Sequence, residues 1–440
     1  MKTPYLPIVT AVWLIAACCS QAQEQKKPLV LLPADDPALV EKIKALPDRT
    51  GMKLNAARLQ GKDLKKWRQK FYRRGPQGRN YCVKMVYNPD RKTAFFCGGN
   101  HGVPHKLADA WEYHLGSNTW TLLAPPEVGD PRGIIGQYGG IKKGREAQAL
   151  EMVKKHVILE NGCLVTRDTG GPINTLHTWD GLTYDPRVKR ALWAAPGTGI
   201  KHETLVSLYA KANNLKVKNV KAKLKPGIKY FWMYDFTKNR WKRHVGPGPY
   251  PLLKFTITMT YMPDLGKTLF YGQYNRQTWT YDAVANKWER IAVTKQGPGM
   301  ECLSAYSPKH KKLVTVHGNN TWTFDPAKRA WTKVCTDKKI WGSDWKTVFG
   351  YDAGNDVFVL YQPSMSDKIG VYSLTTNKWT TPEIKGDAPI GGRCLQGYYD
   401  PDRNALVICQ GLSVWIYRYA RHEAKDGDGD QEPKQGKSAL

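Results

Sequence analysis

Side chains that can do chemistry recur at fixed distances from six tyrosines of this 440-residue sequence. Most stand seven or five residues before a tyrosine, where a strand interior would normally be apolar. They are His177, Lys254, Glu301, Asp344, Lys346 and, between the two positions, Arg393. These charges either pair with one another around a wet channel or bind a charged sugar or peptide. An acid and a base that converge here would suit a lyase or a hydrolase.

Each of the six tyrosines begins a repeated segment, and each segment predicts a pair of β-strands. Two examples are YNPDRKTAFFCGG from Tyr87 and YDPDRNALVICQG from Tyr399, in which proline and polar residues favour a turn and an apolar run favours a buried strand. The other segments begin at Tyr184, Tyr261, Tyr306 and Tyr351. A second hairpin follows five of the tyrosines, and its last strand is headed by Trp120, Trp241, Trp288, Trp331 or Trp379.

Six four-stranded units, the last four at spacings of 45, 45 and 48 residues, predict an all-β fold, a six-bladed β-propeller of antiparallel blades over residues 80–420. The sixth unit lacks its tryptophan-headed strand, and residues 48–57 could supply that strand and close the ring. Before the propeller we expect a helical segment over 24–79, with short helices at 33–46 and 62–72. Two insertions, 124–176 and 200–228, interrupt the period, and the polar tail 421–440 is expected to be disordered.

The first unit resembles the kelch repeat, including the repeats of the galactose oxidase central domain. It has Gly98-Gly99 after the apolar run, then Trp111, Tyr113 and Asn118-Thr119-Trp120. The other units keep one glycine of the doublet or none, so they would be degenerate kelch repeats. The resemblance implies a possible copper cofactor held by two histidines and two tyrosines. Those ligands do not map onto this sequence residue by residue, so we predict no metal site.

Connections of variable length point to a ligand face. In an antiparallel blade, the loops after the second and fourth strands share one end, and both insertions fall there. These loops offer His101, His105, Arg276 and Asn319, and with His177 the two loop histidines could meet near the channel mouth. The second insertion adds Lys211, Lys216, Lys218, Lys221, Lys223 and Lys225. These lysines form either a solvated disordered loop or an arm that contacts an anionic chain.

The net charge of +29 favours anionic partners. Residues 1–23 read as a signal peptide that ends at Ser20-Gln21-Ala22, and Cys18 offers an alternative lipoprotein cleavage and anchor. For a secreted or periplasmic monomer without a transmembrane span, the expected partner is an acidic or sulfated polysaccharide or an acidic protein, not nucleic acid. The alternative is that the charge is evenly spread and only aids solubility.

Four cysteines occupy matching places in two units. Cys82 and Cys394 each stand five residues before a repeat tyrosine, and Cys97 and Cys409 each stand ten after it. Cross-strand disulfides, Cys82–Cys97 and Cys394–Cys409, fit an oxidising compartment, and four buried thiols are the alternative.

Three functions remain open on the sequence. The first is a non-catalytic propeller that binds an anionic ligand on its variable-loop face. The second is a carbohydrate-active enzyme on the same face, either a galactose-oxidase-like copper oxidase or a polysaccharide lyase. The third is a purely structural surface protein.

Overall fold

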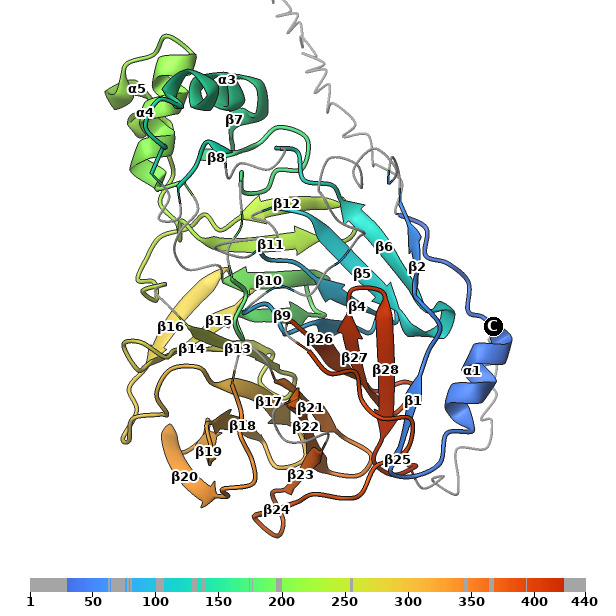
Figure 1. The fold of residues 1–440 in the computed structure, drawn as a ribbon. Helices are drawn as coiled ribbons and strands as arrows, with labels where there is room; N and C mark the ends of the chain where they lie inside the picture. Colours follow the sequence, from blue (N-terminus) through green and yellow to red (C-terminus); the bar gives the residue numbers. More distant parts are fainter. Residues whose placement is uncertain are drawn as a thin grey trace, which may run out of the picture.

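Short antiparallel strands joined by tight turns build a six-bladed β-propeller in the computed structural model (Figure 1). The structure describes residues 30–61, 64, 76, 79, 81–99, 107–128, 133–136, 140–173, 175, 177–194, 200–253, 256–343, 347–363, 368–392 and 394–422. Each blade has four strands in meander order, as the sequence predicts.

The strand bounds follow the repeated segments. Blade 1 contains β3 (Val86–Asn88), β4 (Thr93–Phe96), β5 (Ala110–His114) and β6 (Thr119–Ala124), with the 3-10 helix η1 (Leu115–Ser117). Blade 2 contains β9 (Leu182–Asp185), β10 (Arg190–Ala194), β11 (Phe231–Asp235) and β12 (Arg240–Arg243). Blade 3 contains β13 (Ile257–Met262), β14 (Lys267–Gly272), β15 (Gln277–Asp282) and β16 (Lys287–Ile291).

The remaining blades repeat the pattern. Blade 4 contains β17 (Leu303–Ser307), β18 (Lys312–His317), β19 (Asn320–Asp325) and β20 (Ala330–Thr336). Blade 5 contains β21 (Val348–Asp352), β22 (Val357–Tyr361), β23 (Ile369–Ser373) and β24 (Lys378–Thr380). Blade 6 contains β26 (Gln396–Asp400), β27 (Ala405–Gln410) and β28 (Ser413–Arg418), and its fourth strand is β1 (Thr50–Lys53).

Tyrosine and asparagine side chains lock the turn between the third and fourth strands. The Tyr281 hydroxyl donates to Oδ1 of Asn286 at 2.8 Å, and Asn286 has a left-handed backbone with φ of 53°. Its Nδ2 also donates to the carbonyl of Val245 in the preceding blade, at 2.7 Å. Asparagine tolerates the left-handed region better than most residues, so one residue both forms the turn and joins two blades. The pair Tyr372–Asn377 repeats this arrangement, and in the pair Tyr113–Asn118 the asparagine donates instead to the carbonyl of Asn55, which precedes blade 1.

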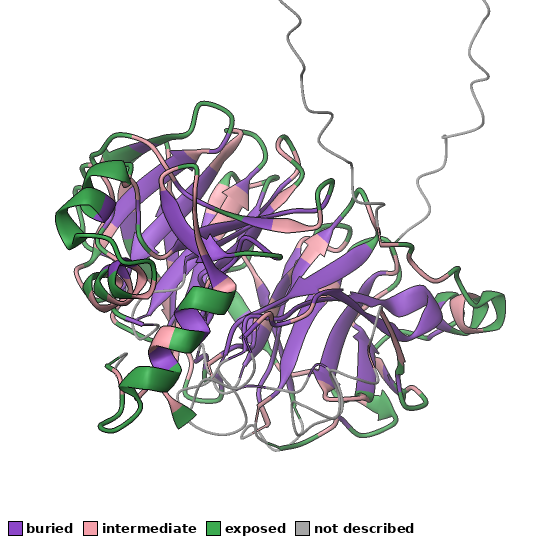
Figure 2. Cartoon of the chain, turned by 90° about the horizontal axis from the view of Figure 1, so that it is seen from above, coloured by how far each residue is buried: buried purple, intermediate pink, exposed green. Residues whose placement is uncertain are grey.

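The hydrophobic core lies between blades. Six clusters of buried side chains each join two neighbouring blades, and a seventh belongs to the insertions. The fourth-strand tryptophan packs into this space: Nε1 of Trp331 donates to Oγ1 of Thr278 at 3.0 Å, and Nε1 of Trp379 donates to Oγ1 of Thr321 at 2.7 Å. Buried indole N–H groups usually find such a partner, although Nε1 of Trp120, Trp241 and Trp288 has none among the described residues. Figure 2 shows the strands largely buried and the helices exposed on their outer side.

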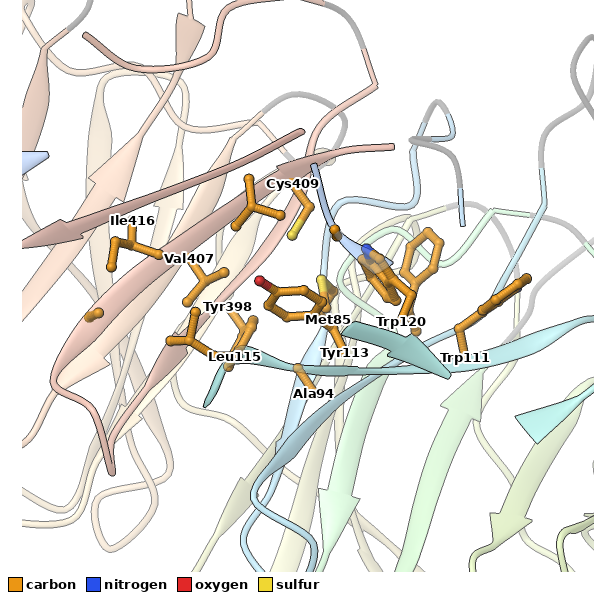
Figure 3. Packing of buried hydrophobic residues seen from close by; sticks show 14 of the residues in the cluster. Met85, Ala94, Trp111, Tyr113, Leu115, Trp120, Tyr398, Val407, Cys409 and Ile416 are labelled. Atoms are coloured by element: carbon orange, nitrogen blue, oxygen red, sulfur yellow. The ribbon is translucent and has the colours of Figure 1, made fainter. Parts of the chain in front are cut away.

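An N-terminal strap closes the ring. Strand β1 pairs antiparallel with β28, at the place where the sequence analysis expects a closing strand. Two short strands were not expected: β2 (Arg58–Gln60) pairs with β6 of blade 1, and β25 (Lys385–Gly386) pairs with β1. The strap therefore spans the seam between blades 6 and 1, whose shared core Figure 3 shows.

Helix α1 (Pro37–Lys44) begins the strap, near the predicted bounds of 33–46. Asp36 caps it by accepting from the backbone N–H groups of Ala38 and Leu39, and Pro37 suits the first helical position. The second predicted helix, 62–72, lies almost entirely outside the described residues. So do the leader with Cys18 and the tail beyond residue 422. Within the described part of the chain, none of the helices has the length and apolar character needed to cross a bilayer.

Candidate ligand-binding face

Both insertions emerge from the same end of the propeller, which we call the loop face. One follows the fourth strand of blade 1 and the other follows the second strand of blade 2, and in antiparallel blades these connections share one end. The first contains α3 (Glu146–His156), β7 (Val157–Glu160) and β8 (Cys163–Thr166). The second contains α4 (His202–Ala212) and α5 (Val217–Lys223). The expectation that the two insertions gather at one rim therefore agrees with the structure.

The two insertions fold together into one small unit, the inserted subdomain. Its core joins Met152 and Val153 of α3 with Val206 and Ala210 of α4 and Val220 of α5. Figure 1 shows these helices side by side above β7 and β8, at the upper left. The second insertion is therefore helical with a buried face, and the alternative of a disordered loop is wrong for this segment.

Hydrogen bonds fix the inserted subdomain to the outer edge of blade 2. Nη2 of Arg240 on β12 lies 2.6 Å from the Glu160 carboxylate of β7. The Trp241 N–H donates to the carbonyl of Thr169 at 2.9 Å. Within the first insertion, the Glu127 carboxylate accepts from the N–H of Asp168 at 2.7 Å. These contacts give the subdomain a defined orientation on the propeller.

The second insertion presents a dense positive surface, which we call the lysine arm. It comprises Lys211, Lys216, Lys218, Lys221, Lys223 and Lys225, all of them exposed. None of these ammonium groups forms an ion pair with a carboxylate of the described residues, whereas Arg187, Arg190 and Arg240 on blade 2 are all paired. Residues 201–225 hold seven lysines and one glutamate. The charge excess is therefore concentrated and uncompensated here.

A repeated backbone bend marks the entrance to the first strand of five blades among the described residues. Tyr81, Trp179, Thr256, Glu301 and Cys394 have left-handed φ values of 60°, 45°, 38°, 68° and 64°. Each stands five or six residues before a repeat tyrosine. Bulky residues rarely adopt this region. Because the bend recurs in five blades, it belongs to the architecture of the blades and does not mark one strained catalytic residue.

His177 lies in an aromatic cluster at the junction of blades 1 and 2. Its ring stacks on Tyr81 with centroids 4.5 Å apart, meets Trp179 edge-on at 5.0 Å, and is 1% exposed. A ligand would have to displace one of these aromatic rings to reach it.

Three other predicted site residues lie around blades 3 and 4. Nη1 of Arg276 donates to Oε1 of Gln296 at 3.4 Å, and the carbonyl of Asn319 accepts from the N–H of Asp337 at 3.0 Å. The charges of Arg276 and Glu301 both affect the pKa of His317. The sequence analysis did not identify His317 as a site residue. Burial lowers the pKa of His317, while the hydrogen bond with the Met300 backbone and the Glu301 charge oppose this effect. Its signal was its place at the end of a second strand, eleven residues after a repeat tyrosine, where blade 3 has Gly272.

The other predicted site residues lie outside the described part of the chain. They are His101, His105, Lys254, Asp344, Lys346 and Arg393. Among the described residues, no group of three or more histidine, cysteine or carboxylate side chains could hold a metal ion. Copper binding thus remains a matter of resemblance alone.

A buried ion pair joins the inner strands, and the sequence analysis did not identify it. Nζ of Lys84 lies 2.9 Å from Oδ1 of Asp180 and donates to the carbonyl of Met259 at 2.7 Å. The hydroxyl of Ser304 donates to the other carboxylate oxygen. These residues belong to the inner edges of blades 1 to 4. Burial raises the pKa of Asp180 to about 6, because its effect is larger than the opposing effect of the Lys84 charge.

The structure contains neither of the predicted disulfides, Cys82–Cys97 and Cys394–Cys409. The strand register explains their absence. Cys409 pairs with Gln396, two residues along from Cys394. In blade 1 the Cys82 thiol instead reaches the carbonyl of Gly99, at 3.1 Å. A two-residue offset places Cα atoms roughly 7–8 Å apart across a strand pair, which is too far for a disulfide.

The blades and their order define this chain as a six-bladed β-propeller. No family model matches it, and no curated protein matches it. An auxiliary nutrient binding protein from Bacteroides thetaiotaomicron aligns with a TM-score of 0.42 and 8% identity, over 77% of this chain and 69% of its own. A nidogen/laminin complex gives a TM-score of 0.38 at 8% identity, covering 69% and 80%. YjhT gives 0.32 at 10% identity, covering 41% and 65%. Membership of the kelch family stays a prediction.

Proposed function

We propose that this protein is an exported, kelch-like propeller that binds an anionic ligand on its loop face without catalysing a reaction. The ligand would be an acidic or sulfated polysaccharide or an acidic protein. The lysine arm is the observation that carries the proposal.

A polyanion is the ligand that the lysine arm would bind most strongly. Six exposed ammonium groups lie within fifteen residues, on a unit whose own core and contacts hold it in place. Their mutual repulsion is relieved when an anionic chain lies across them. Exposed pairs are individually weak, so affinity would come from several contacts at once and would fall as salt screens them.

The experiment presents the full-length protein to an array that carries polygalacturonate, alginate, heparin, chondroitin sulfate, neutral glucans and poly-glutamate. We expect binding to the anionic polymers alone. The test variant is Lys216→Glu/Lys218→Glu/Lys221→Glu. Acidic residues suit the start of α5 at Lys216 and Lys218, whereas Lys221 lies in its last turn, where a glutamate costs about 0.3–1 kcal/mol.

A matched control carries the same change of charge at the opposite end of the propeller. Lys287, Lys328 and Lys378 are exposed at the turns between the third and fourth strands of blades 3 to 5. Their replacement by glutamate should leave binding near the wild-type level. Equal losses in both variants would mean that net charge, and not the arm, attracts the ligand, and would overturn the proposal.

A further inference from the structure

One indole on the loop face is not explained by packing. Trp341 is 53% exposed, and it is the only exposed tryptophan among those that the structure describes. It lies in the connection from blade 4 to blade 5, directly after Ile340, which is 1% exposed and belongs to the core. The chain is therefore anchored one residue away from a side chain that faces solvent.

Backbone hydrogen bonds fix the main chain directly after this tryptophan. Gly318, in the turn after β18, donates to the carbonyl of Gly342 at 2.9 Å, and Gly342 donates back to Gly318 at 2.8 Å. A Cβ atom on Gly318 would lie 3.8 Å from the ring of Trp341, so the indole edge lies over this turn. A ring held in advance loses little freedom when a ligand binds.

Further exposed apolar side chains lie at the neighbouring junction of blades 3 and 4. Met300 is 47% exposed and Tyr274 is 52% exposed. Gln273 holds the two loops together, because its Oε1 accepts from the N–H of Cys302 at 3.0 Å. A Cβ atom on Gly299 would lie 3.2 Å from Nε2 of His317, so His317 stands between the Met300 loop and the Gly318 turn.

We infer that these residues form a subsite that stacks a pyranose ring of an acidic polysaccharide. We call them the blade 3–4 patch, and they are Tyr274, Arg276, Met300, Glu301, His317 and Trp341. The inference rests on the proposed function and narrows its ligand from any polyanion to a glycan.

The chemistry of the patch favours a sugar over an acidic peptide. A pyranose ring has an apolar C–H face that complements the electron-rich face of an indole. Arg276 can bind a carboxylate or sulfate group, and the Glu301 carboxylate can accept from hydroxyl groups. A chain of acidic residues offers no apolar ring face to the indole and no hydroxyl groups to Glu301. The patch and the lysine arm share the loop face, so one polymer can engage both and gain from linked binding.

The experiment compares the affinity of the full-length protein for a galacturonate hexamer and for poly-glutamate. The variants are Trp341→Ala, the conservative Trp341→Phe, and the control Val284→Ala, which truncates a 65% exposed side chain at the turn end of blade 3. We expect Trp341→Ala to weaken hexamer binding about tenfold, as truncation of an aromatic hot spot does, with Trp341→Phe retaining most of the affinity. Poly-glutamate binding should not change.

Each result decides between the two proposals. If Trp341→Ala binds the hexamer like the wild type, or loses both ligands equally, the sugar subsite is refuted while the lysine arm can still stand. If the wild type binds neither polymer, the proposed function itself fails. Loss of hexamer binding alone, rescued by phenylalanine, supports the subsite.

Discussion

Replacing Lys84 by methionine should destabilise the propeller in a way that depends on pH. The change keeps a long apolar stem but leaves the Asp180 carboxylate, whose side chain is 2% exposed, without its cation. Removal of one partner from a buried pair typically costs about 3–5 kcal/mol, because the remaining charge is not compensated.

The pKa of Asp180 determines whether the loss of stability is larger at high or at low pH. Its pKa is raised to about 6 in the folded protein, against about 3.9 for an unfolded aspartate. A raised carboxyl pKa contributes stability that is complete below the unfolded value and is lost as pH rises through the folded value. Lys84 lowers this pKa, so the methionine variant raises it further. We therefore expect a loss of about 3–5 kcal/mol at pH 8, and a clearly smaller loss at pH 5, where Asp180 is mostly protonated.

The assay is urea unfolding of wild type and variant at both pH values. The matched control is Lys84→Met/Asp180→Asn, which removes both charges and should recover much of the loss at pH 8. Equal losses at pH 5 and pH 8, or a double variant no more stable than Lys84→Met, would refute the reasoning.

Three further predictions concern the ring and the thiols. Arg418→Met should release the N-terminal strap, because Arg418 donates to the carbonyls of Lys44 and Leu46; limited proteolysis should then cut before residue 50 while wild type resists. Gly397→Ala should cost about 1–3 kcal/mol in denaturant unfolding, since a Cβ would lie 2.3 Å from the Val407 carbonyl oxygen; an unchanged midpoint would contradict this contact. The seven described cysteines should all titrate with a thiol reagent in denaturant without reductant, and a lower count would restore the disulfides.

The repeat architecture could be predicted because its signals are local. Each tyrosine, turn and apolar run lies within about fifteen residues, and the tryptophan that heads the fourth strand follows from the same period. The missing strand of blade 6 pointed to a donor elsewhere, and β1 lies within the expected 48–57. The additional strands β2 and β25 carry no pattern of their own, because each is only two or three residues long.

The errors arose where the outcome depends on register or on contacts between blades. Counting from the tyrosines placed Cys394 opposite Cys409, but the ladder pairs Cys409 with Gln396. Lys84 and Asp180 are ninety-six residues apart, and only the closed ring brings them together. The two insertions share one core, whose buried residues come from helices in two separate segments of the chain. Neither segment alone shows that the other one covers its apolar residues. The sequence analysis did not identify Trp341, which lies in a connection between two blades.

The salt dependence of polygalacturonate binding tests the central claim most directly. Calorimetry from 50 to 300 mM NaCl gives the slope of log affinity against log salt for wild type, the lysine-arm variant and the matched control. Each lysine that contacts a polyanion should add about 0.7 to the slope, so the arm variant should lose about 2 while the control keeps the wild-type slope. An arm variant with the wild-type slope and affinity would contradict the account.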